Sequence, residues 1–440
     1  MTRRVPGLGA PRDLVFPVVA ERTLVSGLSV VAVRHGQVPL AEIRLRVPFA
    51  GVNGAQAGLL SRTFLSGTAA RTAAEIEAEV QRLGGRLAAT ADADEFVVSG
   101  GGLADGLPRL LHVLGDVLSR AAYPAAEVSV ARDRLAQHVR VAKSQPAYAA
   151  LEALNRLIYG NHPYANQTPD PADIMAVTAD DLRSLHAARL RPAEATLFII
   201  GDVNLDAALD EAEFALMDWK GTDPFPPVLS LPPMPRIPSR PRMVALAGWP
   251  RAVQACVRVA MPVLPRTSPE YAAFQLAHLI FGGYFSSRLV ENLREDKGLA
   301  YTPQSAIVHL LAGSVALVCA DVPADAAAAA LAEIWRELDR GPDAPAGEGE
   351  LQRARQYAMG SLTLSLASQA GVADTLTALA KDGLGPEWVA EHSRRLATVT
   401  GEQVAQAGRY LSRRHAVSLV LGDAETSEPG LAALGEVVRC

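Results

Sequence analysis

The sequence predicts an α+β protein made of two duplicated domains, each with a mainly antiparallel sheet packed with helices. Two observations lead to this prediction. Segments of the two halves match in the same order, and within each half the strands are bunched around helices instead of alternating strictly with them. Strict alternation favours a parallel sheet, whereas bunched strands favour the α+β class. Because two repeats are too few for a solenoid, we interpret the matches as a domain duplication.

The duplication rests on three pairs of matching segments. In the longest pair, a Thr-capped helix is followed by a basic turn and by an apolar strand that ends in Gly-Asp. The pairs are Val177–Val203 with Val399–Ala424, 131–139 with 354–362, and Arg44–Pro48 with Arg258–Pro262. Three matches in one order indicate that a single unit gave rise to both halves.

A proline-rich segment marks the seam between the two copies. Eight prolines fall between Pro224 and Pro241, a density that neither a helix nor the interior of a sheet tolerates. We therefore expect an extended, semi-rigid linker at 224–241. The first domain is predicted at 14–223 and the second at 242–440.

Local patterns place the elements of the first half. Hydrophobic and charged residues alternate through 41–47, which predicts a strand in a sheet with one wet or helix-free face. Thr72 and Glu75 have the spacing of a capping box, and the helix that they begin is expected to end at Gly84-Gly85. The other elements expected in this half are a strand at 94–99, a turn between strand and helix at Gly100–Gly102, and helices at 107–120, 125–143 and 146–158.

Composition and charge exclude several classes of protein. With 49% hydrophobic and 20% charged residues in 440, the chain has the balance of a globular protein. A net charge of -5 without a clustered basic face argues against a nucleic-acid partner. The three cysteines, Cys256, Cys319 and Cys440, are too few and too scattered for a disulfide framework or a Cys-rich metal site.

No targeting segment stands out in the sequence. Pro6, Gly7, Gly9 and Pro11 interrupt any apolar run near the N-terminus, so no signal peptide is visible. No stretch of about 18 apolar residues suggests a membrane span. We expect a cytoplasmic protein, or a periplasmic one if a signal peptide has been removed.

Several short motifs, in this order and spacing, resemble the pitrilysin (inverzincin) zinc-peptidase superfamily over nearly the whole chain. The similarity is greatest to two-domain subunits such as those of the mitochondrial processing peptidase and its bacterial relatives. The resemblance implies duplicated α+β domains, and two such chains, or two linked halves, that close like a clamshell around a peptide. The motifs are Gly67-Thr68, Gly84-Gly85, Asn161–Tyr164, Val177–Leu182, and Ser287–Leu289 through Leu293-Arg294 to Gly298–Tyr301.

The motif that binds zinc in active members of this superfamily is missing. In H-x-x-E-H, two His one helical turn apart hold the metal and the Glu activates its water. Counted back from Gly67-Thr68, the motif positions here run from Gly58 to Arg62 and include Ser61. No His lies between His35 and His112, so another register cannot supply the motif. A guanidinium at Arg62 cannot donate to a metal.

The remaining metal-shell position and the metal itself follow from the same resemblance. The further Glu of active members, roughly 75 residues downstream, corresponds here to Gln137 or His138. A lone His on a helix is more often a packing or surface residue than a ligand. The resemblance therefore implies no metal and no other cofactor in this chain, with zinc expected in a partner subunit.

The second half keeps a different part of the machinery. In this superfamily the second domain supplies an Arg and a Tyr seven residues apart, which correspond here to Arg294 and Tyr301. We expect a helix at 287–296, a left-handed residue at Gly298 and a strand that starts at 299–302, so that both side chains reach one cleft. A fixed cation and a phenol suit the oxygen of a tetrahedral intermediate or of a substrate carbonyl.

Plainer interpretations stand beside these. Arg294 is also explained as a solvated helix residue, and Tyr301 as an aromatic at a sheet edge. The segment His162–Tyr164 is interpreted as a structural turn after a helix that ends near Gly160. The pair Gly282-Gly283 is a possible substrate loop, since the mitochondrial non-catalytic subunit has a longer glycine-rich loop at this place.

Taken together, these features predict a non-catalytic subunit of a heterodimeric zinc metalloendopeptidase. Its partner would be a homologous chain with an intact H-x-x-E-H motif, and its substrates would be unfolded peptides. One alternative is a metal-free structural scaffold in a larger complex, which needs the fold but no chemistry. The other is a homodimer that binds peptides without any metal.

Overall fold

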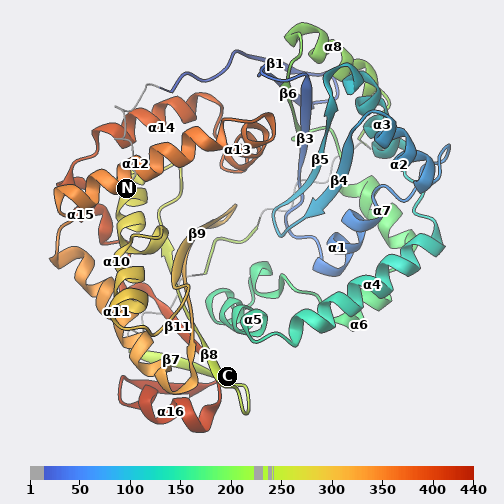
Figure 1. Ribbon diagram of the computed structural model, residues 1–440. Helices are drawn as coiled ribbons and strands as arrows, with labels where there is room; N and C mark the ends of the chain where they lie inside the picture. Colours follow the sequence, from blue (N-terminus) through green and yellow to red (C-terminus); the bar gives the residue numbers. More distant parts are fainter. Residues whose placement is uncertain (1–13, 222–230, 236–239, 241) are drawn as a thin grey trace, which may run out of the picture.

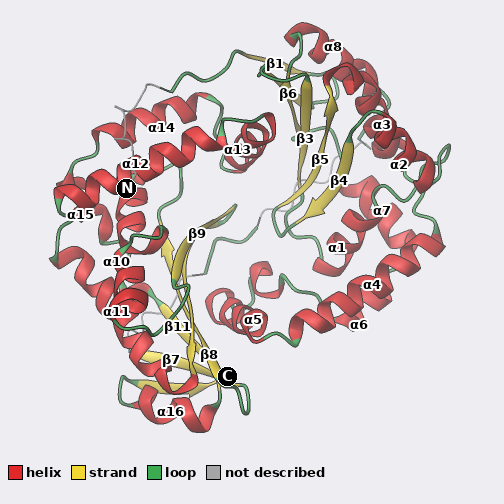
Figure 2. Ribbon diagram, in the orientation of Figure 1, coloured by secondary structure: helices red, strands yellow, loops and turns green. Residues whose placement is uncertain are grey.

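A computed structural model describes residues 14–221, 231–235, 240 and 242–440. Its two six-stranded sheets, each accompanied by helices, are separate in Figure 2. Most of the predicted linker at 224–241 lies outside the described residues, and the domain bounds 14–223 and 242–440 stay predictions. Within the described ranges, no helix is long and apolar enough to cross a membrane.

The first half contributes one sheet and its helices. Its elements are β1 (Val19–Thr23), β2 (Ser29–Arg34), β3 (Leu40–Pro48), α1 (Gly54–Thr63), α2 (Ala73–Arg82), β4 (Arg86–Ala91), β5 (Glu95–Leu103), α3 (Leu107–Arg120), α4 (Ala125–Lys143), α5 (Pro146–Tyr159), η2 (Pro163–Asn166), α6 (Pro171–Ala176), α7 (Ala179–Arg189), β6 (Thr196–Gly201) and α8 (Leu205–Ala215). The predicted capping box is confirmed, because the Thr72 hydroxyl accepts from the Glu75 N–H and the Glu75 carboxylate accepts from the Thr72 N–H. The three long helices predicted between 107 and 158 are also confirmed.

The second half contributes the other sheet. Its elements are β7 (Met243–Gly248), β8 (Gln254–Val263), α9 (Tyr271–His278), the π-helical turn η3 (Leu279–Gly283), α10 (Arg288–Val290), the π-helical turn η4 (Glu291–Asp296), β9 (Gln304–Leu310), β10 (Gly313–Pro323), α11 (Ala327–Asp343), α12 (Glu348–Ser365), α13 (Gln369–Lys381), α14 (Glu387–Thr398), α15 (Gly401–Gly408), β11 (Val417–Gly422), α16 (Ala424–Ala432) and β12 (Glu436–Arg439).

The strand orders confirm the predicted duplication and fold class. The first sheet runs β1-β2-β6-β3-β5-β4 and the second β12-β7-β11-β8-β10-β9. From the second strand onwards the two orders correspond one to one, so β4 and β9 are matching edge strands. The pairs β2–β6, β7–β11 and β7–β12 are parallel and the others antiparallel. The fold is therefore a duplicated α+β unit with mainly antiparallel sheets.

Each half covers one face of the other half's sheet. Helix α5 of the first half packs against β8 and β11, and helix α13 of the second half packs against β3 and β6. Figure 1 shows both helices between the two sheets. The opposite face of each sheet buries its hydrophobic residues under helices of its own half. The central strands of both sheets are therefore covered on both faces, whereas β4 and β9 keep exposed residues.

This exchange of helices corrects one expectation. The charged face of β3 was predicted to be wet or free of helices, yet Glu42, Arg44 and Arg46 are only 5–7% exposed. Helix α13 covers them, and they are neutralised in pairs: Arg44 Nη1 lies 2.8 Å from Glu42 Oε2, and Arg46 Nε lies 2.7 Å from Glu95 Oε2. The alternation predicted the strand correctly. The helix that covers it, α13, lies about 330 residues further along the chain, where Asp374 pairs with Arg44.

A second correction concerns Gly100–Gly102. These residues were predicted to form a turn between strand and helix, but they lie inside β5. Their lack of side chains serves close packing within the sheet. A Cβ at Gly101 would lie 2.5 Å from Glu42 Oε1, and one at Gly102 would lie 3.0 Å from the Cα of Gly85. These glycines therefore make room for a buried carboxylate and for the end of the neighbouring strand.

Candidate functional site

Helix α1 carries the positions that were expected to correspond to the zinc motif, and this assignment stays a prediction. Leu59 and Leu60 are fully buried in the core, whereas Gly58 and Ser61 are half-buried and Arg62 is exposed. Positions i, i+3 and i+4 share one helix face. The three positions that would bear metal ligands and the general base therefore lie together on the outward face of α1.

The residues on this face do not fit a zinc ion. Arg62 Nη1 donates to the carbonyl of Gly58 at 3.0 Å, and the Ser61 hydroxyl donates to the same carbonyl at 3.1 Å. A guanidinium has no lone pair to give to a metal, and zinc sites use Cys, His, Asp or Glu. On the neighbouring helix α4, Gln137 and His138 are exposed. Across the described parts of the chain, no group of three or more His, Cys, Asp or Glu is placed to hold a metal.

In the second half, the turn after the helix brings Arg294 and Tyr301 together, and the cleft that both were expected to reach stays a prediction. The π-helical turn η4 ends at Asp296, and Gly298 has a φ of +60°. The backbone N–H of Leu299 then donates to the carbonyl of Leu293 at 2.7 Å, which turns the chain back. As a result, the guanidinium carbon of Arg294 lies 5.1 Å from the centre of the Tyr301 ring.

Local details of this segment differ from the prediction. The expected helix is a short α-helix, Arg288–Val290, that continues as a π-helical turn, and single-turn π-helices occur frequently at functional sites. The strand begins at Gln304 and not at 299–302. Residues 299–303 form instead a short connection that leaves Tyr301 78% exposed.

A residue that the sequence analysis missed completes this cluster. The ring centre of Phe285 lies 4.9 Å from the guanidinium carbon of Arg294, and Phe285 is 66% exposed. Arg294 Nε also lies 3.3 Å from Glu295 Oε1. The available signal was the place of Phe285 two residues after Gly283 and two residues before the cap at Ser287. We call Phe285, Arg294 and Tyr301 the aromatic–arginine cluster.

Comparisons with known proteins identify the family. Residues 52–172 match the family model described as Insulinase (Peptidase family M16), and residues 176–357 match the model described as Peptidase M16 inactive domain. Together the two matches span well over half of the chain.

The chain belongs to peptidase family M16.

The resemblance to the pitrilysin superfamily is thereby confirmed, and the second match is to a domain described as inactive.

Curated relatives and solved structures agree with this assignment. The M16 chain is 27% identical over 375 residues to proteins of Mycobacterium tuberculosis and Mycobacterium bovis that are named zinc proteases, with 83% of each chain covered. It superimposes on a peptidase M16 inactive domain of Pseudomonas fluorescens with a TM-score of 0.85 at 22% identity, covering 92% of this chain and 98% of that one. A Helicobacter pylori protease gives a TM-score of 0.84 at 19% identity, with coverages of 93% and 100%. These structures confirm the fold.

The predicted glycine loop of the M16 chain is a tightly packed turn. Gly282 and Gly283 lie in the π-helical turn η3. A Cβ at Gly282 would lie 2.9 Å from the Cβ of Ser305, and one at Gly283 would lie 2.8 Å from His278 Nδ1. The pair lets β9 and α9 approach each other closely, and its role toward substrate stays a prediction.

Histidines packed inside the second half stay neutral near pH 7. His278 Nε2 lies 2.9 Å from the Ser305 hydroxyl, and burial lowers the pKa of His278 to about 4. Burial, with Arg266 and other cations nearby, lowers the pKa of His309 to about 3. Burial likewise lowers the pKa of His392 to about 4, and its Nε2 lies 2.7 Å from Gln275 Oε1. The sequence did not reveal these contacts because they join separate elements.

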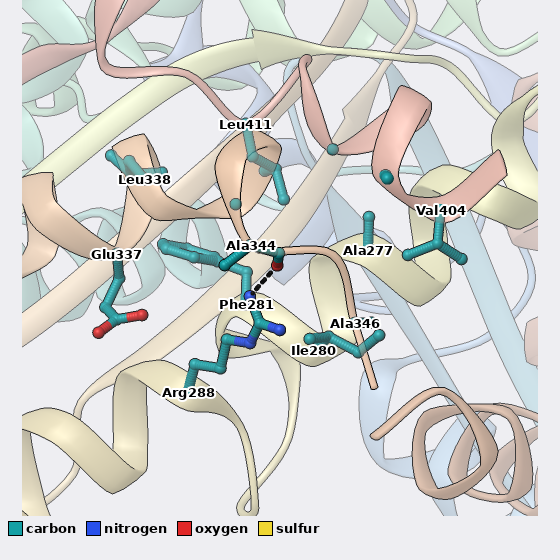
Figure 3. Close-up of a pocket in the computed structure, with 13 residues that line it drawn as sticks. Ala277, Ile280, Phe281, Arg288, Glu337, Leu338, Ala344, Ala346, Val404 and Leu411 are labelled. Carbon is teal, nitrogen blue, oxygen red and sulfur yellow. Dashed lines mark hydrogen bonds between the residues drawn. The ribbon is translucent and has the colours of Figure 1, made fainter. Parts of the chain in front are cut away.

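A small pocket in the second half is too small to be a ligand site. Figure 3 shows Phe281, Leu338, Val404 and Leu411 around it, with Arg288 at its edge donating to the carbonyl of Ala344 at 3.0 Å. Its volume of about 30 Å³ is far below the roughly 300–1,000 Å³ of ligand pockets. It is a packing gap between helices α9, α11 and α15.

The two halves of the M16 chain are joined at a buried carboxylate. Asp94 is 1% exposed and accepts from the Tyr164 hydroxyl at 2.5 Å and from the Leu311 N–H at 2.9 Å. The Tyr164 hydroxyl in turn accepts from the Ala312 N–H at 3.2 Å. The segment His162–Tyr164 is thus structural, as predicted. It connects the turn before β5 with the β9–β10 turn of the other half.

A lysine of the second half completes this junction. Lys381 Nζ lies 3.2 Å from Glu95 Oε1, 3.4 Å from Asp92 Oδ2 and 3.9 Å from Asp94 Oδ2. Burial lowers the pKa of Lys381, but the three carboxylates more than offset this effect, so that its pKa is raised. The junction therefore holds α13 against the first sheet with a charged lysine.

Proposed function

We propose that this chain is a non-catalytic subunit of a heterodimeric zinc metalloendopeptidase. Residues 176–357 match the M16 inactive domain, and the outward face of α1 carries Gly58, Ser61 and Arg62 in place of the metal ligands and the general base. The observation that carries the proposal is the stacking of Arg294 against Tyr301 at 5.1 Å. A chain whose described residues form no metal-binding group still keeps a cation and a phenol side by side at an exposed place.

In this proposal the work is divided between two chains. A homologous partner with an intact H-x-x-E-H motif holds the zinc and activates the water. Arg294 and Tyr301 donate hydrogen bonds to the oxygen of the scissile carbonyl, where negative charge develops in the transition state. A guanidinium offers a fixed positive charge and several N–H donors, and a phenol offers one neutral O–H donor. Both are stronger donors to an oxyanion than to a carbonyl, so they favour the transition state.

Unfolded peptides fit this arrangement as substrates. Among the described strands, β4 and β9 each have a neighbour on one side only. Strand β4 lies beside α1, and β9 begins three residues after Tyr301. An extended peptide can pair with such an edge through its main chain, which gives affinity without strict sequence specificity.

The proposal is tested by reconstitution. The purified chain is mixed with an M16 homologue from the same organism that carries the intact motif, and cleavage of a fluorogenic peptide is measured. We expect activity only in the mixture, and Arg294→Ala to lower kcat about 10²–10³-fold, the usual cost of losing an oxyanion donor. Tyr301→Phe is expected to lower kcat as well, since it removes only the hydroxyl.

Matched controls make this test specific. Arg82→Ala removes an exposed arginine of α2, and Tyr357→Phe removes the hydroxyl of a tyrosine that is 47% exposed on α12. Both are expected to leave the rate unchanged. Unchanged rates with Arg294→Ala and Tyr301→Phe as well would refute the assigned role. Recovery of the chain as a peptide-binding homodimer, or in a larger complex without a peptidase homologue, would favour one of the alternatives.

A further inference from the structure

The guanidinium of Arg294 lies close to two exposed aromatic rings, and only one of them belongs to the proposed pair. Its central carbon is 4.9 Å from the ring centre of Phe285 and 5.1 Å from that of Tyr301. The Arg294 side chain is 30% exposed between two rings that are 66% and 78% exposed as residues. Both distances fall within the range of a cation–π contact.

Burial in the core does not explain why a phenylalanine occupies position 285. It lies between the buried turn η3 and the buried cap Ser287, yet most of its own surface is in water. A phenylalanine exposed to this degree gains little from burial. Its nearest described aromatic or charged contact is the guanidinium of Arg294. The structure thus gives this exposed ring a partner, and the partner is the cation of the proposed site.

We infer that Phe285 is a positioning residue, which holds Arg294 in place for the substrate oxygen. This inference rests on the proposed function. A long arginine side chain at a surface samples many rotamers, and a second ring beside the guanidinium restricts them. Aromatic rings contact the face of a planar guanidinium, so its terminal N–H groups, which lie in the plane, remain available to an oxygen acceptor while Nε lies 3.3 Å from Glu295 Oε1. Phe285 does not touch the reacting atoms and acts through Arg294.

Two substitutions separate this role from a simple apolar contact. Phe285→Leu keeps an apolar side chain but removes the aromatic face, whereas Phe285→Tyr keeps the face. Because Phe285 is largely exposed, neither change disturbs the core. Phe214 is a matched control, since it is 61% exposed at the end of α8 in the other half and contacts His112.

The first measurement uses the chain alone. The protein is labelled with ¹⁵N-arginine, and the Nε–H signal of Arg294 is assigned by its absence in Arg294→Lys. Ring currents displace this signal, so Phe285→Leu should move it toward the position of a free arginine. Phe285→Tyr and Phe214→Leu should leave it in place. A signal that stays unchanged in Phe285→Leu would overturn the inference.

The second measurement uses the reconstituted complex. We expect Phe285→Leu to lower kcat about fivefold with little change in KM, the scale of one cation–π contact, and Phe285→Tyr to restore it. Equal losses in the Leu and Tyr variants, or a change in KM alone, would contradict a positioning role. If Arg294→Ala itself has no effect while the Arg294 signal still moves in Phe285→Leu, the proposed function fails but the contact between ring and cation stands.

Discussion

The carboxylate of Asp94 in the first half accepts a hydrogen bond of 2.9 Å from the backbone N–H of Leu311 in the second half. This bond joins two residues that are 217 positions apart. With the Tyr164 hydroxyl on its other oxygen, Asp94 connects a turn of the first half with a turn of the second. Asp94 is thus one buried charge among several contacts that hold the two halves together.

Asp94→Ala should destabilise the whole chain. The change leaves the Tyr164 hydroxyl and the Leu311 N–H without their acceptor and removes a neighbour of Lys381, so we expect a loss of about 3 kcal/mol in the free energy of unfolding. Urea denaturation measures it. Glu391→Ala is the control, because it removes an exposed i,i+4 pair with Arg395 and should cost less than about 1 kcal/mol. A loss in Asp94→Ala no larger than in this control would show that the junction is not needed for stability.

The chain should lose stability as the pH falls from about 6.5 toward 4. His278 and His392 have folded pKa values of about 4, below their unfolded values. In this window the unfolded state binds more protons, so stability rises with pH and falls in acid. Each histidine should contribute about 1.5 kcal/mol to this loss between pH 6.5 and 5. Urea midpoints measured across this range test the prediction.

The histidine variants identify the source of this pH dependence. His278→Gln keeps a polar group near Ser305 and should flatten the curve between pH 6.5 and 5. His415→Gln, at an exposed site, should keep the wild-type slope. If both variants have the same slope as the wild type, protonation of His278 is not the cause.

Gly101→Ala should be destabilising, although Ala is a small residue. Its Cβ would lie 2.5 Å from Glu42 Oε1, a carboxylate that is paired with Arg44 and Arg86. Displacing this carboxylate should cost about 2 kcal/mol or more. The contrast is Gly360→Ala in α12, where nothing lies within 4 Å and a gain of up to about 1 kcal/mol is expected. Thermal unfolding of both variants decides the matter, and a Gly101→Ala variant as stable as the wild type would contradict the packing argument.

Features of the fold that depend on neighbours in sequence were predictable. The capping box at Thr72 joins residues three apart, and the left-handed Gly298 ends its own turn. The internal matches also gave the duplication, which the corresponding strand orders confirm. These signals are local or repeated, so a single sequence carries them.

Features that depend on contacts between distant segments were not predictable. The charged face of β3 reads as a wet surface because nothing near it in sequence shows that Asp374 and α13 cover it. Phe285 reads as an ordinary hydrophobic residue until the turn at Gly298 returns the chain beside Arg294. Gly100–Gly102 read as a turn because the carboxylate that needs their space belongs to another strand.

Metal analysis of the purified chain tests most directly the claim that the chemistry is shared between two polypeptides. After incubation with zinc and removal of excess metal, the account predicts well below one zinc per chain and no proteolysis without the partner. The partner should bind zinc under the same conditions. One tightly held zinc per molecule of this chain, together with proteolysis by the chain alone that a chelator abolishes, would contradict the account.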